Sequence, residues 1–138
     1  MQQRDYILNE ARKLALLLAK LLGLKTEDKE EEYRKYFNEI LQDEYNAELE
    51  ALLQLNHTDF NDTLDKANYS AEKLNMLSQM LYMFAEPFEA TDKTASLLQK
   101  VLAIYDLLET KYHFESFDNL TKRNAIYGFF KIYHEQRT

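Results

Sequence analysis

Apolar residues recur along the chain at the spacing of an α-helix, most regularly between Ser70 and Tyr112. At about 100° per residue, the segment that follows Ser70 places its apolar side chains on an arc of roughly 200°. We predict that Ser70 caps this helix and that Pro87, the only proline, ends it. The arc consists of Leu74, Met76, Leu77, Met80, Leu81, Met83, Phe84 and Ala85.

A second helix is predicted after a short link through Phe88 to Ala90, with Thr91 or Asp92 as its N-cap. So short a link between two helices is typical of antiparallel neighbours. The apolar residues that recur in this helix are Leu97, Leu98, Val101, Leu102, Ile104, Tyr105, Leu108 and Tyr112.

The N-terminal segment also reads as a helix, ending at Gly23, a residue suited to the left-handed conformation that closes helices. Charged residues such as Arg12 and Lys20 interrupt the apolar run, which argues against a secretory signal and leaves it too short to span a membrane. Its apolar arc is again about 200° wide and contains Ile7, Leu8, Ala11, Leu14, Ala15, Leu17, Leu18, Leu21 and Leu22.

Thr26 is the predicted cap of a charged helix that runs from Glu27 to about Leu41. A similar apolar stripe extends to Leu53, so residues 26–55 form one helix or, with a break at Asn46, two. The carboxylates at the start of this segment favour a solvated helix N-terminus over a metal site, because adjacent side chains on a helix point in different directions.

Two breaks follow in the pattern. Residues 56–69 predict a connector with one short helix capped by Thr58 or Asp59, and residues 113–118 precede a last helix that ends near His134. The apolar positions of this last helix cover more than half of its circumference. Such a helix either lies between two others or leaves a face for another molecule. The candidate interaction surface is Ile126, Tyr127, Gly128, Phe129, Phe130 and Tyr133.

Composition agrees with an all-helical chain. Only 2 Gly and 1 Pro occur in 138 residues, which leaves little turn chemistry for β-hairpins. We therefore predict one all-α domain over residues 1–138, with five to seven helices in antiparallel pairs, as a bundle or a tetratricopeptide-like array. Cysteine is absent, so neither disulfides nor thiolate metal sites are expected, and a reducing cytoplasm is the expected compartment.

The formal net charge of −7 argues against nucleic acid as a partner, because phosphate binding needs clustered Lys and Arg. Catalytic chemistry is not visible either. His57, His113 and His134 lie in or beside breaks or near the end of the chain, and none forms a metal-binding pair at helical spacing. The sequence predicts no catalytic, metal or cofactor residues and no cofactor.

The opening Arg4-Asp5-Tyr6-Ile7-Leu8, the Leu-rich first helix and the Lys/Glu-rich helix that follows resemble an uncharacterised bacterial family of small helical proteins. The resemblance covers roughly the first 60 residues, and it implies tetratricopeptide-like helix pairs in the later part. It transfers no catalytic motif. The chain also departs from a true tetratricopeptide array, because it lacks the Gly and Tyr signature and shows no self-similarity at about 34 residues.

These observations favour a non-enzymatic interaction or assembly module with an unidentified protein partner, and a homodimer through the last helix. The alternative is a small-ligand-binding protein or an enzyme with a site between helices. Ten Tyr and eight Phe fit either a core edge or a peptide groove. A deep polar pocket with convergent carboxylates or histidines would favour the alternative, and a shallow aromatic groove or two-fold contact would favour the module.

Overall fold

A computed structural model describes the chain from residue 3 to residue 137, with side chains from residue 8 to residue 136. Seven helices and no strand occur in this part of the chain, which confirms the all-α prediction. The helices cluster into two compact units, residues 1–55 and residues 56–138, and each unit is described by itself. The expectation that the whole chain forms one domain stays a prediction.

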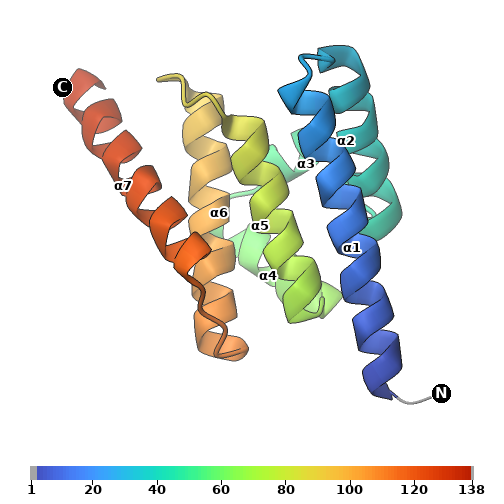
Figure 1. The fold of residues 1–138 in the computed structure, drawn as a ribbon. Helices are drawn as coiled ribbons and strands as arrows, with labels where there is room; N and C mark the ends of the chain where they lie inside the picture. Colours follow the sequence, from blue (N-terminus) through green and yellow to red (C-terminus); the bar gives the residue numbers. More distant parts are fainter. Residues whose placement is uncertain (1–2, 138) are drawn as a thin grey trace. The chain divides into compact units, whose positions relative to one another are not determined.

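Unit 1 contains α1 (Gln3–Thr26), α2 (Glu30–Tyr45) and the short α3 (Leu49–Gln54). Helices α1 and α2 lie side by side in antiparallel directions (Figure 1). The Lys13 ammonium reaches the Glu44 carboxylate at 2.9 Å, and the Lys20 ammonium lies 4.5 Å from the ring centre of Tyr36. The side chains buried in unit 1 include Leu14, Leu21, Tyr33, Phe37, Ile40, Leu41 and Tyr45.

The predicted end of the first helix at Gly23 is wrong, because α1 continues to Thr26 and neither glycine of the described chain has a positive φ. Asp28 takes the left-handed conformation instead, with φ of 58°. Thr26 does not cap the next helix. Its hydroxyl donates to the backbone carbonyl of Leu22 at 2.8 Å, and α2 begins after Lys29 without a side-chain cap. A threonine inside a last turn satisfies its hydroxyl most easily in this way.

The apolar arc predicted for the first helix is only partly covered. Leu14 and Leu21 are buried, whereas Leu8 and Leu22 are half exposed. Ile7, which belonged to the same predicted arc, lies outside the described side chains. The α1 arc is therefore wider than the face that unit 1 buries.

Residues 26–55 contain two helices that follow α1 rather than one, and Asn46 makes the break. Asn46 has φ of 48°, and its backbone N–H donates to the Gln42 carbonyl at 3.0 Å, which closes the last turn of α2. Asparagine tolerates the left-handed conformation better than most residues, so a single Asn in an otherwise helical pattern suffices to end α2.

Unit 2 contains α4 (His57–Ala67), α5 (Ala71–Ala85), α6 (Asp92–Lys111) and α7 (Phe117–Arg137). Helices α5 and α6 form the predicted antiparallel pair, while α7 flanks α6 along an outer edge of the unit (Figure 1). Helix α4 also packs on α6. The fully buried large side chains of this unit include Phe60, Leu74, Leu77, Met80, Leu81, Leu97, Leu98, Ile104 and Tyr105.

Helices α4, α5 and α6 each begin after a residue whose side chain accepts a hydrogen bond from a backbone N–H group of the first turn. Ser70 accepts from Lys73 N–H at 3.2 Å and Thr91 accepts from Thr94 N–H at 3.1 Å, which confirms both predicted caps. The short helix in the first break is capped by Asn56, not by Thr58 or Asp59. Asn56 has the extended backbone that an N-cap requires, whereas the other two already lie inside α4.

Candidate functional site

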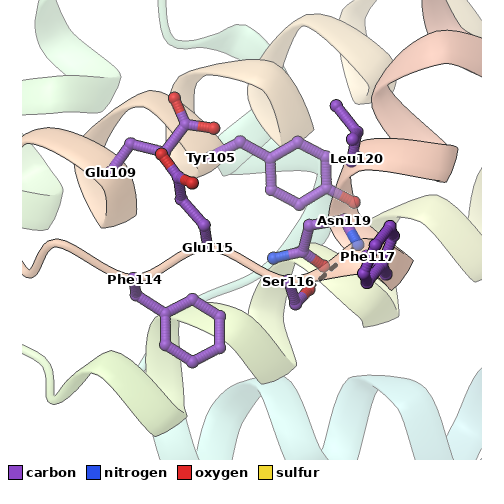
Figure 2. Close-up of a pocket in the computed structure, with 8 residues that line it drawn as sticks. All are labelled: Tyr105, Glu109, Phe114, Glu115, Ser116, Phe117, Asn119 and Leu120. Atoms are coloured by element: carbon purple, nitrogen blue, oxygen red, sulfur yellow. Dashed lines mark hydrogen bonds between the residues drawn. The ribbon is translucent and has the colours of Figure 1, made fainter.

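A cavity of about 400 Å³ lies at the junction between α6 and α7. Its walls come from the second half of α6, from the linker that follows it and from the first turn of α7, as Figure 2 shows. The lining residues are Tyr105 and Glu109 of α6, Phe114, Glu115 and Ser116 of the linker, and Phe117, Asn119 and Leu120 of α7.

The linker between α6 and α7, residues 112–116, is fixed at both of its ends by hydrogen bonds. The N–H groups of Tyr112 and Phe114 both donate to the Leu108 carbonyl, at 3.2 and 2.9 Å. His113 between them has φ of 52° and turns the chain out of α6. Ser116 then accepts from Asn119 N–H at 3.0 Å and starts α7. The cavity walls are thus fixed by one helix end and one helix cap.

Tyr105 belongs to the cavity lining, but its hydroxyl oxygen is buried. The residue is 1% exposed, and its hydroxyl has no hydrogen-bond partner in the structure. Burial raises the pKa of Tyr105, and the nearby Asp118 carboxylate raises it further, whereas the Arg123 guanidinium, 5.5 Å from the centre of the Tyr105 ring, lowers it. Ser78 already donates to the Asn75 carbonyl at 2.6 Å. A polar group buried without a partner costs stability, so this hydroxyl is an unusual feature of the core.

Asn119 is the second buried polar residue of the lining, at 8% exposed. Its side-chain amide donates to Asn75 Oδ1 at 2.9 Å and so joins the first turn of α7 to α5. Although Asn119 belongs to an Asn-x-Ser/Thr triplet, its role in the fold is this link between helices. The sequence contains no signal that pairs these two asparagines, because 44 positions separate them.

Two carboxylates stand at one side of the cavity. Figure 2 shows the side chains of Glu109 and Glu115 extending toward the same side of the cavity, from α6 and from the linker. The guanidinium of Arg123, outside the lining, donates to Glu109 at 3.0 Å and to Asp106 at 3.2 Å. Glu115 has no ion-pair partner among the residues that the structure describes. The lining itself contains no basic residue.

The residues predicted as an interaction surface on the last helix separate into a buried and an exposed group. Ile126 is fully buried, and Tyr133 is 8% exposed with its hydroxyl bonded to the Asp92 carboxylate at the start of α6. Tyr127 is half exposed. A Cβ added at Gly128 would meet no atom within 4 Å.

Phe129 and Phe130 are partly buried and belong to an aromatic cluster. The ring of Phe129 lies 5.9 Å from Phe88 of the link between α5 and α6, and 5.4 Å from Tyr133 in a stacked arrangement. Phe130 stacks on His134 at 5.6 Å. The cluster attaches the second half of α7 to the link between α5 and α6 through Phe88, and its ring contacts add to the stabilisation from apolar burial.

Large apolar side chains that remain exposed are confined to the first and last helices of the described chain. They are Leu8, Leu16 and Leu22 of α1, and Phe117, Leu120, Tyr127 and Ile132 of α7. Phe117 is the most exposed of them, at 88%. Phe117 and Leu120 also belong to the cavity lining.

The three histidines are all exposed. Within the described residues, no group of three or more His, Asp and Glu side chains is arranged to hold a metal ion. No described helix is both long and apolar enough to cross a membrane.

Comparison of the chain with protein-family models, with curated proteins and with solved structures finds no match.

Sequence reasoning did not select the cavity. Tyr105 appeared only as one apolar position of a predicted core helix, and Glu109 and Glu115 were unremarkable charged residues in and beside it. The one available signal was a tyrosine at a core position, because a buried hydroxyl needs a partner that the sequence does not identify.

Proposed function

We propose that the protein is a non-enzymatic interaction or assembly module and that it forms a homodimer through the exposed face of α7. The observation that carries the proposal is the apolar surface of this helix, where Phe117, Leu120, Tyr127 and Ile132 are all at least half exposed. Apolar patches of this kind on a folded domain commonly mark protein contacts.

Gly128 supports the same interpretation. A glycine in the middle of a helix costs up to about 1 kcal/mol relative to alanine. Nothing within this chain requires it, because a Cβ at this position would meet no atom within 4 Å. A second chain that approaches the α7 backbone at Gly128 would supply a reason. The acidic charge of the chain favours a protein partner over nucleic acid.

We also propose a cytoplasmic location, which the absence of cysteine supports. We propose as well that the chain belongs to the uncharacterised bacterial family that it resembles, whose later part contains tetratricopeptide-like helix pairs. The antiparallel α5–α6 pair supports it, while the missing repeat signature limits the likeness to helix pairing.

The two glycines of the chain provide a matched test. Gly23 in α1 has the same open surroundings as Gly128. Light scattering across a concentration series, with chemical denaturation, should be applied to wild type, Gly128→Ala, Gly128→Leu, Gly23→Ala and Gly23→Leu. We expect the wild type to dimerise, the Gly128 variants to dimerise less with leucine the weaker, and the Gly23 variants to dimerise normally.

A wild type that stays monomeric at a protein concentration of about 100 μM would contradict the proposal, because a dimer with a dissociation constant in that range would be partly formed. So would equal association of the wild type and Gly128→Leu. In either case Gly128→Ala should stabilise the chain as much as Gly23→Ala does, because both substitutions then only remove the flexibility of a solvent-facing glycine.

The alternative function, a small-ligand site between helices, has one observation in its favour. The cavity at the α6–α7 junction has the volume of a small-molecule site, and the side chains of Glu109 and Glu115 belong to its lining.

A further inference from the structure

We infer that α1 carries a second self-association surface, which binds α1 of another copy of the chain in the antiparallel direction about a two-fold axis at Ala15. The surface, the α1 face, consists of Leu8, Ala11, Ala15, Ala19 and Leu22. It lies wholly within unit 1. The inference goes beyond the proposed function, because the α1 face shares no residue with α7 and associates whether or not α7 does.

The α1 face is open to solvent at both ends and at its centre. Leu8 is 51% exposed and Leu22 is 52% exposed, and Ala15 between them is exposed as well. The side of α1 that buries Leu14 and Leu21 lies about 100° or more away from Ala15 around the helix. Single exposed leucines are ordinary, but a second apolar side on one helix indicates a contact that unit 1 does not supply.

The side chains of the α1 face follow the same order in both directions from Ala15. Ala11 and Ala19 lie four positions before and after it, and Leu8 and Leu22 lie seven positions before and after it. At about 100° per residue, all five positions stay within about 40° of the direction of Ala15. A two-fold contact joins a surface to itself, so it requires this kind of self-complementarity.

The antiparallel direction follows from the same order. With the axis at Ala15, Leu8 of each copy meets Leu22 of the other, and the alanines meet between them. The distance between two packed helices depends on the side chains at the contact, and alanines let the two backbones approach closely. The leucines at both ends then cover the alanine backbone from solvent. The sizes of the side chains therefore match a second α1 face.

The charge of the α1 face also favours a second copy. Among the described side chains of α1, Arg12 is the only charged one within about 60° of Ala15. Lys13 and Lys20 lie on another side and interact with α2, through the Glu44 carboxylate and the Tyr36 ring. An acidic protein or an anionic membrane would thus meet one cation on this surface, whereas another α1 face offers matching neutral apolar area.

The size of the α1 face predicts a weak contact. From Leu8 to Leu22 the helix is about 21 Å long. A single helix of this length on each side gives an interface in the small class, below roughly 1,200 Å² of total buried surface, which is typical of transient contacts. We therefore expect a dissociation constant on the order of 0.1–1 mM, which a covalent trap detects more readily than light scattering does.

Single cysteines provide this trap, because the chain contains no cysteine of its own. Each variant of the full chain should be oxidised with diamide at about 100 μM protein and analysed by non-reducing gel electrophoresis. A disulfide requires two Cα atoms within about 7 Å of each other. Ala15→Cys should form a covalent dimer, because the two-fold axis places both copies of this residue side by side.

The ends of the α1 face test its direction. Leu8→Cys alone and Leu22→Cys alone should form little covalent dimer, because each residue lies about 21 Å along the helix from its own copy in an antiparallel pair. An equal mixture of the two variants should form the mixed dimer. If Leu8→Cys alone formed as much dimer as the mixture, the two helices would pair in the parallel direction and the inference would be overturned.

Ala51→Cys is the matched control, because Ala51 is an exposed helical alanine of unit 1 outside α1. Ala15→Cys should form covalent dimer at least about tenfold faster than Ala51→Cys, since a contact raises the local concentration of the second thiol. Equal rates would show random collision of exposed thiols and would overturn the inference. Circular dichroism checks that each variant is folded.

The Gly128→Leu substitution separates this inference from the proposed function. Ala15→Cys should form covalent dimer at the same rate with and without Gly128→Leu, because the α1 face is separate from α7. A loss of the dimer in the Gly128→Leu chain would overturn the inference. Conversely, if Gly128→Leu left light scattering unchanged while Ala15→Cys still formed its dimer, only the homodimer through α7 would be rejected.

Discussion

The α5–α6 pair and α7 belong to one unit and carry apolar arcs of similar breadth, but the structure covers them to different extents. In the α5–α6 pair nearly every large apolar side chain is buried, including Leu77, Leu81, Leu98 and Ile104. In α7 only one side of the arc is covered, by Ile126 and Tyr133, while Tyr127 and Ile132 face outward.

The difference lies in the number of neighbours. Helix α6 packs on α4, α5 and α7, so its apolar residues meet a partner around much of its circumference. Helix α7 meets α6, the start of α5 through Asn119, and the link at Phe88. The amphipathic pattern of a helix thus predicts which side chains can be buried, and the number of neighbouring helices determines how many of them are buried. The uncovered part of α7 is where the proposed function places a partner chain.

The largest expected effect contrasts a leucine of each helix. Leu81→Ala in α5 should lower the free energy of unfolding by about 2–5 kcal/mol, because it leaves a cavity in a fully buried position. Leu120→Ala in α7 should change it by less than about 0.5 kcal/mol, because Leu120 is half exposed. Urea denaturation measures both. A loss above about 2 kcal/mol for Leu120→Ala would mean that another molecule covers α7.

The polar link between α5 and α7 should come next. Asn119→Ala removes the donor to Asn75 Oδ1 and should cost about 1–3 kcal/mol. Asn75→Ala and the double variant complete a cycle that isolates the pair. A coupling energy near zero would show that contacts other than the Asn119–Asn75 hydrogen bond attach α7 to the unit.

The two helix caps give a closer comparison. Thr91→Ala at α6 and Ser116→Ala at α7 each remove a side-chain acceptor for a backbone N–H, and each should cost about 1 kcal/mol. Differential scanning calorimetry provides the measurement, and Lys29→Ala at α2, where no side-chain cap exists, is the control. If Ser116→Ala cost much less than Thr91→Ala, the first turn of α7 would be frayed in solution.

The smallest effect concerns Tyr105. At neutral pH, Tyr105→Phe should leave stability unchanged or raise it by up to about 1 kcal/mol, since it removes a hydroxyl without a partner. The pKa of Tyr105 is raised above its ordinary value of 10.0 chiefly by burial, so the unfolded chain loses this proton first as the pH increases. Ionisation of Tyr105 therefore has no effect on stability below that value, and it destabilises the fold progressively as the pH rises above it.

Urea denaturation at a series of alkaline pH values tests that sign. The stability advantage of Tyr105→Phe over wild type should grow as the pH rises above 10.0. Tyr82, whose pKa burial also raises, is the control: it is only partly buried, and Tyr82→Phe should give a smaller change. An advantage of Tyr105→Phe that stayed constant with pH would contradict the assignment of a buried, neutral phenol.

Much of the fold was predictable from local pattern. Helical periodicity predicted the helical class and the α5–α6 pair, and the caps at Ser70 and Thr91 and the break at Asn46 followed from single side chains. The errors were local as well. The pattern predicts a helix end at Gly23 and a helix cap at Thr26, but both residues lie inside α1. A residue that is able to end a helix does so only where the chain turns.

The cavity and the division of α7 into covered and open faces depended on tertiary structure. Tyr105 and Asn119 are separated by a helix end, a linker and a cap, and no periodicity relates them. The sequence by itself determined which side chains prefer burial and where backbone N–H groups find caps, since both depend on neighbours within a few residues. Only the tertiary structure decided which buried hydroxyl lacks a partner and which apolar side chains face water, because both depend on contacts between distant segments.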